Sequence, residues 1–123
     1  MLEVELWYLG RCPVCKGVDK HLRRICARLG VPYIRRYITR YVDPYSELGE
    51  FYVVDLEKRT ISPEPFKGVD RLMRRLQPTP IVLIKLYRPD GSTMKFVVMG
   101  FRLEEQAFRN FELLLQTILR VRR

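Results

Sequence analysis

The hydrophobic pattern changes its period abruptly at residues 10–13, and this change constrains the fold more than any other feature of the chain. Residues 3–9, Glu-Val-Glu-Leu-Trp-Tyr-Leu, alternate and then become wholly apolar, which is typical of a strand entering the interior of a sheet. From Pro13 to Leu29, apolar residues recur at helical spacing, with Lys and Arg on the opposite side. Gly30 follows as a suitable helix end. The sequence therefore predicts a strand followed by a helix that packs on a sheet.

Two cysteines, Cys12 and Cys15, lie at this strand-to-helix junction in the motif Cys-Pro-Val-Cys. Unpaired backbone N–H groups at a helix N-terminus favour a thiolate over a thiol, so Cys12 is the candidate nucleophile. Cys15 falls one turn into the helix on the same side, where its thiol can attack a mixed disulfide formed at Cys12. Cys15 is therefore the candidate resolving thiol of a redox site.

The residues around the motif each have a functional and a structural interpretation. Arg11 and Lys16 either lower the pKa of the Cys12 thiol or are solvated surface charges, and the sequence favours neither. Trp7 and Tyr8 either shape a substrate groove or pack in the sheet. One further side chain, His21, lies at the margin of the apolar arc, which is more typical of a partly buried surface residue than of a group that tunes thiols.

The rest of the chain continues with further strand and helix signals. The elements are expected in the order second strand, insertion, second helix, third strand, fourth strand and third helix, over residues 31–40, 41–65, 66–76, 79–87, 93–99 and 103–119. A right-handed crossover makes the first two strands parallel, and Asp90-Gly91 marks a hairpin between the last two. The insertion is the least legible segment, and its residues 51–56 suit either a strand or a helical piece.

Length and composition indicate one domain over residues 1–123. A chain of 123 residues buries about two-thirds of its unfolded surface in a single core, and no apolar run approaches the roughly eighteen residues of a membrane span. The first residues carry acid where a secretory signal would carry basic charge. We therefore expect a cytoplasmic protein. Its three cysteines are too few for a disulfide framework.

The charge balance is strongly basic. A net charge of +9, from 23 Lys and Arg against 14 Asp and Glu, is able to attract nucleic acid or acidic partners. Because basic residues occur throughout the chain, a solvated basic surface is the favoured interpretation, and nucleic-acid binding is an alternative.

The order of elements, with Cys-x-x-Cys after the first strand and Thr-Pro opening the third, resembles the thioredoxin-fold thiol-disulfide oxidoreductases, which include thioredoxins and glutaredoxins. The resemblance covers Leu2–Ile38 and Pro78–Leu119. It implies an α/β fold with a central mixed four-stranded sheet flanked by helices, here with an insertion between the second strand and the second helix. It also implies a cis-proline at Pro80 beside the disulfide and a substrate-binding edge at Thr79. The dipeptide Pro13-Val14 is similar to glutaredoxins and is expected to contact substrate.

The chain departs from both branches of that family. The paired glycines of a glutathione site are missing, and the position matching the buried acid of thioredoxin is Leu6. Glu5 is adjacent, but successive strand residues point to opposite faces, so its side chain is expected on the other face. The proton acceptor for Cys15 is therefore left open.

We accordingly expect a thiol-disulfide oxidoreductase without metal or organic cofactor. Its partners would be a disulfide-bearing protein or small-thiol substrate, and a reductase or thiol that recycles it. The first alternative is a basic binding module of the same fold, which holds nucleic acid or a partner protein and uses its cysteines structurally.

A zinc knuckle is the second alternative, with its ligands at Cys12, Cys15, His21 and Cys26. Its spacing is one residue too long, and a continuous helix would place Cys12 and Cys26 about 20 Å apart. Cys26 is better interpreted as a buried apolar residue, because it lies about 16 Å from Cys15 along the helix and beyond disulfide reach.

Overall fold

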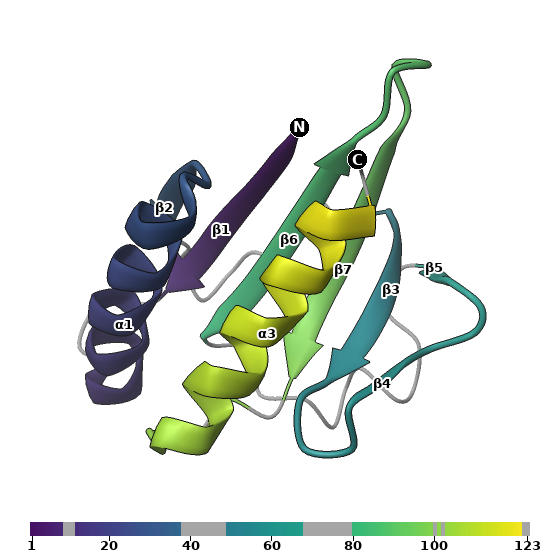
Figure 1. Cartoon of the computed structure of the whole chain (residues 1–123). Helices are drawn as coiled ribbons and strands as arrows, with labels where there is room; N and C mark the ends of the chain where they lie inside the picture. Colours follow the sequence, from purple (N-terminus) through teal and green to yellow (C-terminus); the bar gives the residue numbers. More distant parts are fainter. Residues whose placement is uncertain (9–11, 38–48, 68–79, 100, 102, 122–123) are drawn as a thin grey trace.

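The protein has an α/β fold in which two described helices cover one face of a mixed sheet (Figure 1). The computed structural model describes residues 1–8, 12–37, 49–67, 80–99, 101 and 103–121. Its elements are β1 (Leu2–Tyr8), α1 (Pro13–Leu29), β2 (Tyr33–Tyr37), β3 (Glu50–Asp55), β4 (Thr60–Ile61), β5 (Phe66–Lys67), β6 (Ile81–Tyr87), β7 (Thr93–Met99) and α3 (Glu105–Val121).

Six of these strands form one sheet in the order β2-β1-β6-β7-β3-β4, and the short β5 pairs separately with β3. β1 and β2 are parallel, as predicted from the crossover through α1. β6 and β7 form the predicted antiparallel hairpin, with Gly91 at a positive φ of 91° in its turn. β6 also pairs antiparallel with β1, which places the hairpin beside the β1-α1-β2 unit.

The sheet contains more strands than the four predicted, because the insertion supplies its own. Residues 50–55 form β3, which pairs parallel with β7 and brings β4 with it. Burial explains why the sequence left the structure of this segment ambiguous. Its side chains are buried on both faces, at Phe51, Val53 and Val54, so no alternation of apolar and polar residues marks it as a strand.

The helix predicted over residues 66–76 does not begin where expected. Phe66 and Lys67 form β5 and pair with Phe51 and Glu50. The ring of Phe66 lies 6.3 Å from that of Phe51, centroid to centroid, so packing against β3 outweighs the local helical spacing. The remainder of that predicted helix lies outside the described residues.

The main core lies between the sheet and the two helices. β1 contributes Leu2, Val4 and Leu6 to this face. The helices contribute the apolar stripes that their sequences predicted, namely Val18, Leu22, Ile25 and Cys26 from α1 and Phe108, Phe111 and Leu115 from α3. Neither described helix has the length and apolar character that crossing a bilayer requires.

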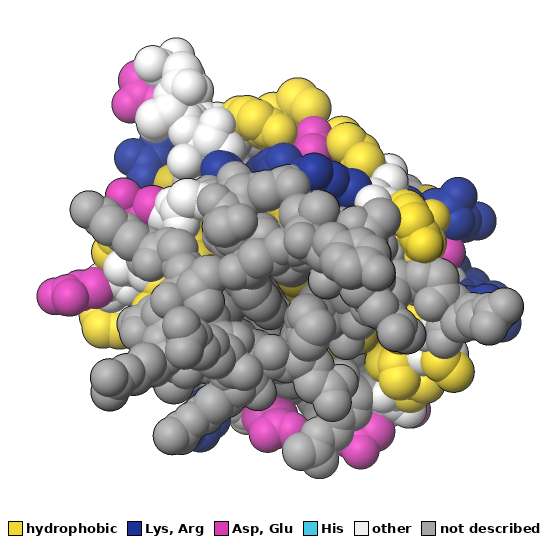
Figure 2. Space-filling view, turned by 180° about the vertical axis from the view of Figure 1, so that it is seen from behind, with side chains coloured by type: hydrophobic (Ala, Val, Ile, Leu, Met, Phe, Trp, Pro, Cys, Tyr) yellow, Lys and Arg dark blue, Asp and Glu magenta, His cyan; other side chains and the backbone are white. Residues whose placement is uncertain are grey.

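The opposite face of the sheet holds a second apolar cluster, formed by Trp7, Phe51, Val53, Ile81, Leu83 and Val97. Figure 2 looks toward this side of the molecule, where hydrophobic, basic and acidic side chains of the described residues all reach the surface. The sheet is thus buried on both faces, which is consistent with the continuous apolar runs of its central strands.

Candidate functional site

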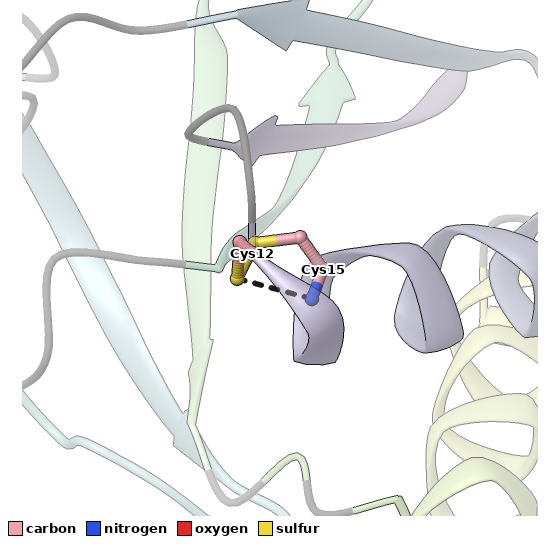
Figure 3. Close-up of a disulfide and its surroundings, with 2 residues drawn as sticks. All are labelled: Cys12 and Cys15. Carbon is pink, nitrogen blue, oxygen red and sulfur yellow. Dashed lines mark hydrogen bonds between the residues drawn. A yellow bond between two sulfur atoms is a disulfide. The ribbon is translucent and has the colours of Figure 1, made fainter.

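Cys12 and Cys15 are joined by a disulfide at the N-terminus of α1, with their Cα atoms 5.2 Å apart (Figure 3). Cys12 is the N-cap residue, in extended backbone conformation with φ of −104° and ψ of 106°. The backbone N–H of Cys15 donates a hydrogen bond to the Sγ atom of Cys12 across 3.2 Å. A sulfur atom therefore takes the capping position that a Ser, Asp or Asn oxygen usually occupies.

The two sulfur-bearing residues differ in access to solvent. Cys12 is half-buried, whereas Cys15 is only 3% exposed. The residues that follow Cys12 in the first turn of α1 and are exposed are Pro13, Val14 and Lys16. Pro13 occupies the first helical turn, where its missing N–H costs no hydrogen bond. An approaching partner would therefore meet Cys12 first, with an apolar dipeptide and a cation beside it.

The sheet brings Pro80 to the end at which this disulfide lies. Trp7, near the end of β1, is the register partner of Ile81, the first residue of β6, and Pro80 directly precedes it. The end of β1, the start of α1 and the start of β6 lie toward the same edge of the molecule (Figure 1). Pro80 is half-buried there. Thr79 and Arg11 lie outside the described residues, so their predicted roles stay predictions. The cis peptide bond expected at Pro80 also stays a prediction.

Trp7 is a packing residue, because it is 2% exposed and belongs to the cluster on the face opposite α1. The guanidinium of Arg36 lies 4.5 Å from the centroid of its indole ring, a cation–π geometry that the parallel pairing of β1 with β2 creates. Tyr8 is half-buried and its ring meets that of Tyr37 edge-on, 5.7 Å away. Sequence reasoning missed Arg36 and Tyr37, because only the register of β2 places them here.

Glu5 points away from α1, as expected from strand geometry. Its carboxylate pairs with the Lys85 ammonium at 2.7 Å, and its side chain is 8% exposed. Burial alone would lower the pKa of Lys85, but the hydrogen bond and the negative charge of Glu5 outweigh it and raise that pKa above its usual value. Leu6, the residue before Trp7 on β1, is buried in the main core. Glu5 therefore pairs with Lys85 on the face of the sheet opposite α1, and its side chain does not point toward the helix that carries Cys15.

The other two candidate zinc ligands lie further along α1, which is one continuous helix from Pro13 to Leu29. His21 is exposed and stacks its ring on Phe108 of α3, with centroids 4.0 Å apart. Cys26 is buried, and its burial raises the pKa of its thiol to about 11. Within the described ranges, no three His, Cys, Asp or Glu side chains gather in a way that could hold a metal ion.

A charged cluster that sequence reasoning did not single out lies where α1 meets β2. Asp19 accepts a hydrogen bond from the Tyr33 hydroxyl at 2.7 Å, and forms ion pairs with Arg23 at 3.3 Å and Arg35 at 3.5 Å. The spacing of Asp19 and Arg23, four residues apart on a helix, was a visible signal in the sequence. The contributions of Tyr33 and Arg35 depend on the docking of β2 beside α1.

No family model, curated protein or solved structure matches this chain. The interpretation of the site therefore depends on its own geometry.

Proposed function

We propose that the protein is a thiol-disulfide oxidoreductase with a thioredoxin-like arrangement, acting through Cys12 and Cys15. The observation that carries this proposal is the Cys12–Cys15 disulfide itself, which closes at a helix N-cap with the more accessible residue facing out. A backbone N–H already aimed at the Cys12 sulfur would also stabilise the thiolate of the reduced form.

The arrangement of elements supports the proposal. A parallel β1-α1-β2 unit lies beside an antiparallel β6-β7 hairpin, and α1 and α3 pack on the same face of the sheet. Apart from the helix expected over residues 66–76, these are the elements that the thioredoxin-like interpretation requires, and β3 and β4 extend them at the edge next to β7.

The proposed reaction is a two-step thiol-disulfide exchange. The Cys12 thiolate attacks one sulfur of a substrate disulfide, the substrate S–S bond breaks, and the other substrate sulfur leaves as a thiolate that takes up a proton. Cys15 loses its proton and attacks the Cys12 sulfur, which breaks the mixed disulfide and releases the second substrate thiol. The substrate gains two electrons and two protons, and the protein ends as the Cys12–Cys15 disulfide.

In this proposal the substrate segment lies along Thr79 and Pro80 and over the exposed Pro13-Val14 dipeptide. An external thiol or a reductase returns the protein to its dithiol form. The same chemistry suits a reducing compartment such as the cytoplasm, where thiols are kept reduced.

The test is reduction of a test protein disulfide, such as that of insulin, with dithiothreitol as the electron source. We expect Cys12→Ser to abolish catalysis and Cys15→Ser to accumulate a mixed disulfide through Cys12. Cys26→Ser is the matched control and should keep wild-type turnover, because its thiol is buried away from the motif. Full activity of Cys12→Ser, or no activity of the wild-type protein, would falsify the proposal.

A further inference from the structure

Positive charge is concentrated on the part of the chain that carries the disulfide. Residues 13–37, which form α1, β2 and their connection, contain a single acidic residue, Asp19. The same stretch contains seven basic residues, Lys16, Lys20, Arg23, Arg24, Arg28, Arg35 and Arg36. Lys and Arg side chains project at the right-hand edge of Figure 2, the side on which α1 and β2 lie. Seven against one is a net +6, so two-thirds of the excess charge of +9 lies in one fifth of the chain.

Asp19 organises part of this charge into a fixed cluster. Arg23 and Arg35, from two different elements, both approach its Oδ2 atom, at 3.3 and 3.5 Å. Its Oδ1 atom is occupied by the Tyr33 hydroxyl at 2.7 Å. One carboxylate therefore faces two guanidinium groups, and the cluster keeps a positive charge.

The two guanidinium groups remain accessible to a ligand. The side chains of Arg23 and Arg35 are 56% and 49% exposed. A guanidinium carries five N–H donors, and Asp19 engages only a few of them. Two Arg side chains held together with donors toward solvent have the chemistry that recognises carboxylates.

The cluster lies in line with the reactive sulfur. Cys12, Lys16, Asp19 and Arg23 are spaced at four, three and four residues, so they form one stripe along α1. Eleven residues of helix separate the ends of this stripe by about 16 Å. A polypeptide bound at Cys12 can therefore reach Arg23 with a side chain only a few residues from its own disulfide.

We propose that Arg23 and Arg35, which meet at Asp19, and Lys16, which lies between them and Cys12 on the stripe, bind acidic side chains next to the disulfide of a polypeptide substrate. This inference rests on the proposed function and names its substrate class, disulfide-bearing chains with Asp or Glu near the disulfide. A polypeptide is favoured over a nucleic acid because the stripe leads to a sulfur that reacts with disulfides. The one aromatic residue of the cluster, Tyr33, is also half-buried against Asp19 and offers no stacking platform.

The experiment compares two peptide disulfides that differ only in four flanking residues, Asp and Glu in one and Asn and Gln in the other. The readout is the ratio of their kcat/KM values with the reduced full-length protein. We expect the acidic peptide to be preferred about fivefold at low salt. The preference should disappear at about 1 M salt, where screening acts within a few ångströms. In Arg23→Gln/Arg35→Gln, the ratio should fall to about one.

Arg109→Gln is the matched control. Arg109 also forms an exposed ion pair with a residue four positions away on a helix, Glu105 at 2.9 Å, but it lies on α3. Its removal should leave the ratio at the wild-type value. Because the readout is a ratio, a general loss of stability or turnover in a variant does not affect it.

A binding arm separates this inference from the proposed function. Fluorescence anisotropy of the acidic peptide, with its cysteines replaced by serine, measures recognition without exchange. Binding that Arg23→Gln/Arg35→Gln weakens supports the cluster even if no disulfide is reduced, in which case only the proposed function fails. Equal kcat/KM values for both peptides, or tighter binding of a single-stranded oligonucleotide through the same two arginines, would overturn the inference.

Discussion

The backbone N–H of Cys15 donates to the Sγ atom of Cys12 across 3.2 Å, so Cys12 both forms the disulfide and caps the helix that carries it. This contact couples the geometry of the motif to the start of α1. Cys12 is the more accessible of the two, because it is half-buried whereas Cys15 is only 3% exposed. Two neighbouring thiols that are chemically alike in sequence therefore have different environments in the fold.

The first prediction concerns this difference. In the fully reduced protein, iodoacetamide should label Cys12 at least about tenfold faster than Cys15, because only Cys12 is accessible and lies at the helix N-terminus. Peptide mapping after a short pulse measures the two rates. Equal labelling would contradict the assignment of Cys12 as the nucleophile.

The second prediction concerns Cys26. The oxidised native protein should show no reactive thiol toward a thiol-specific reagent at pH 8, because burial raises the pKa of Cys26 to about 11 and keeps the thiol protonated and covered. In denaturant one thiol per chain should react, and its rate should report global unfolding. A thiol that reacts at once in the native oxidised protein would show that the packing of α1 on the sheet differs from that described.

The third prediction concerns the ion pair on the far face. Glu5→Gln should lower the free energy of unfolding by about 2 kcal/mol, since it removes the carboxylate that pairs with the partly buried Lys85 ammonium. Glu105→Gln removes the acid of an exposed pair and should cost less than about 0.5 kcal/mol. Chemical denaturation of the two variants measures both values, and equal costs would show that Glu5 contributes no more than a surface charge.

The fourth prediction concerns alkaline pH. Burial and the hydrogen bond to Asp19 raise the pKa of Tyr33 above its usual value of 10, so the folded state favours the neutral phenol. The stability that Tyr33 contributes is complete below pH 10 and is lost as pH rises above it, because the unfolded chain ionises first. Above pH 10, the free energy of unfolding of Tyr33→Phe should therefore fall less steeply with rising pH than that of the wild type. Denaturation curves measured from pH 9 to 11 give this free energy at each pH. An identical pH dependence in the two proteins would contradict the Tyr33–Asp19 contact.

The fifth prediction concerns Gly17, where a Cβ atom would come within 2.5 Å of the Leu103 side chain. In the wild-type background, the exposed end of the Leu103 side chain must move aside, which should reduce the gain from the better helix propensity of alanine. In a Leu103→Ala background, Gly17→Ala should instead stabilise the protein by about 0.5–1 kcal/mol. A double-mutant cycle from thermal or chemical unfolding measures the coupling, and additive effects would show that the two residues do not meet.

Local information in the sequence determined the part of the fold around the disulfide. The stripe of Val18, Leu22 and Ile25, together with Pro13 and Gly30, predicted the bounds of α1 to the residue, with Gly30 as its left-handed cap at φ of 67°. These signals are readable because periodicity and capping depend on neighbours within one or two turns. The β6-β7 hairpin and α3 were predicted from similarly local signals, and the parallel pairing of β1 with β2 was predicted from the handedness of the crossover through α1.

Tertiary structure alone decided the features that join distant segments. The pairing of β3 with β7, the capture of Phe66 by Phe51, and the meeting of Arg35 with Asp19 each join residues that no local pattern relates. Strand register sets which side chains share a face, and a shift by one residue would reverse them all. The sequence by itself therefore determined where the two cysteines lie and which helix they open. Only long-range packing decided that β3 widens the sheet and that two arginines converge beside the helix of the disulfide, because such contacts form between elements only after they dock.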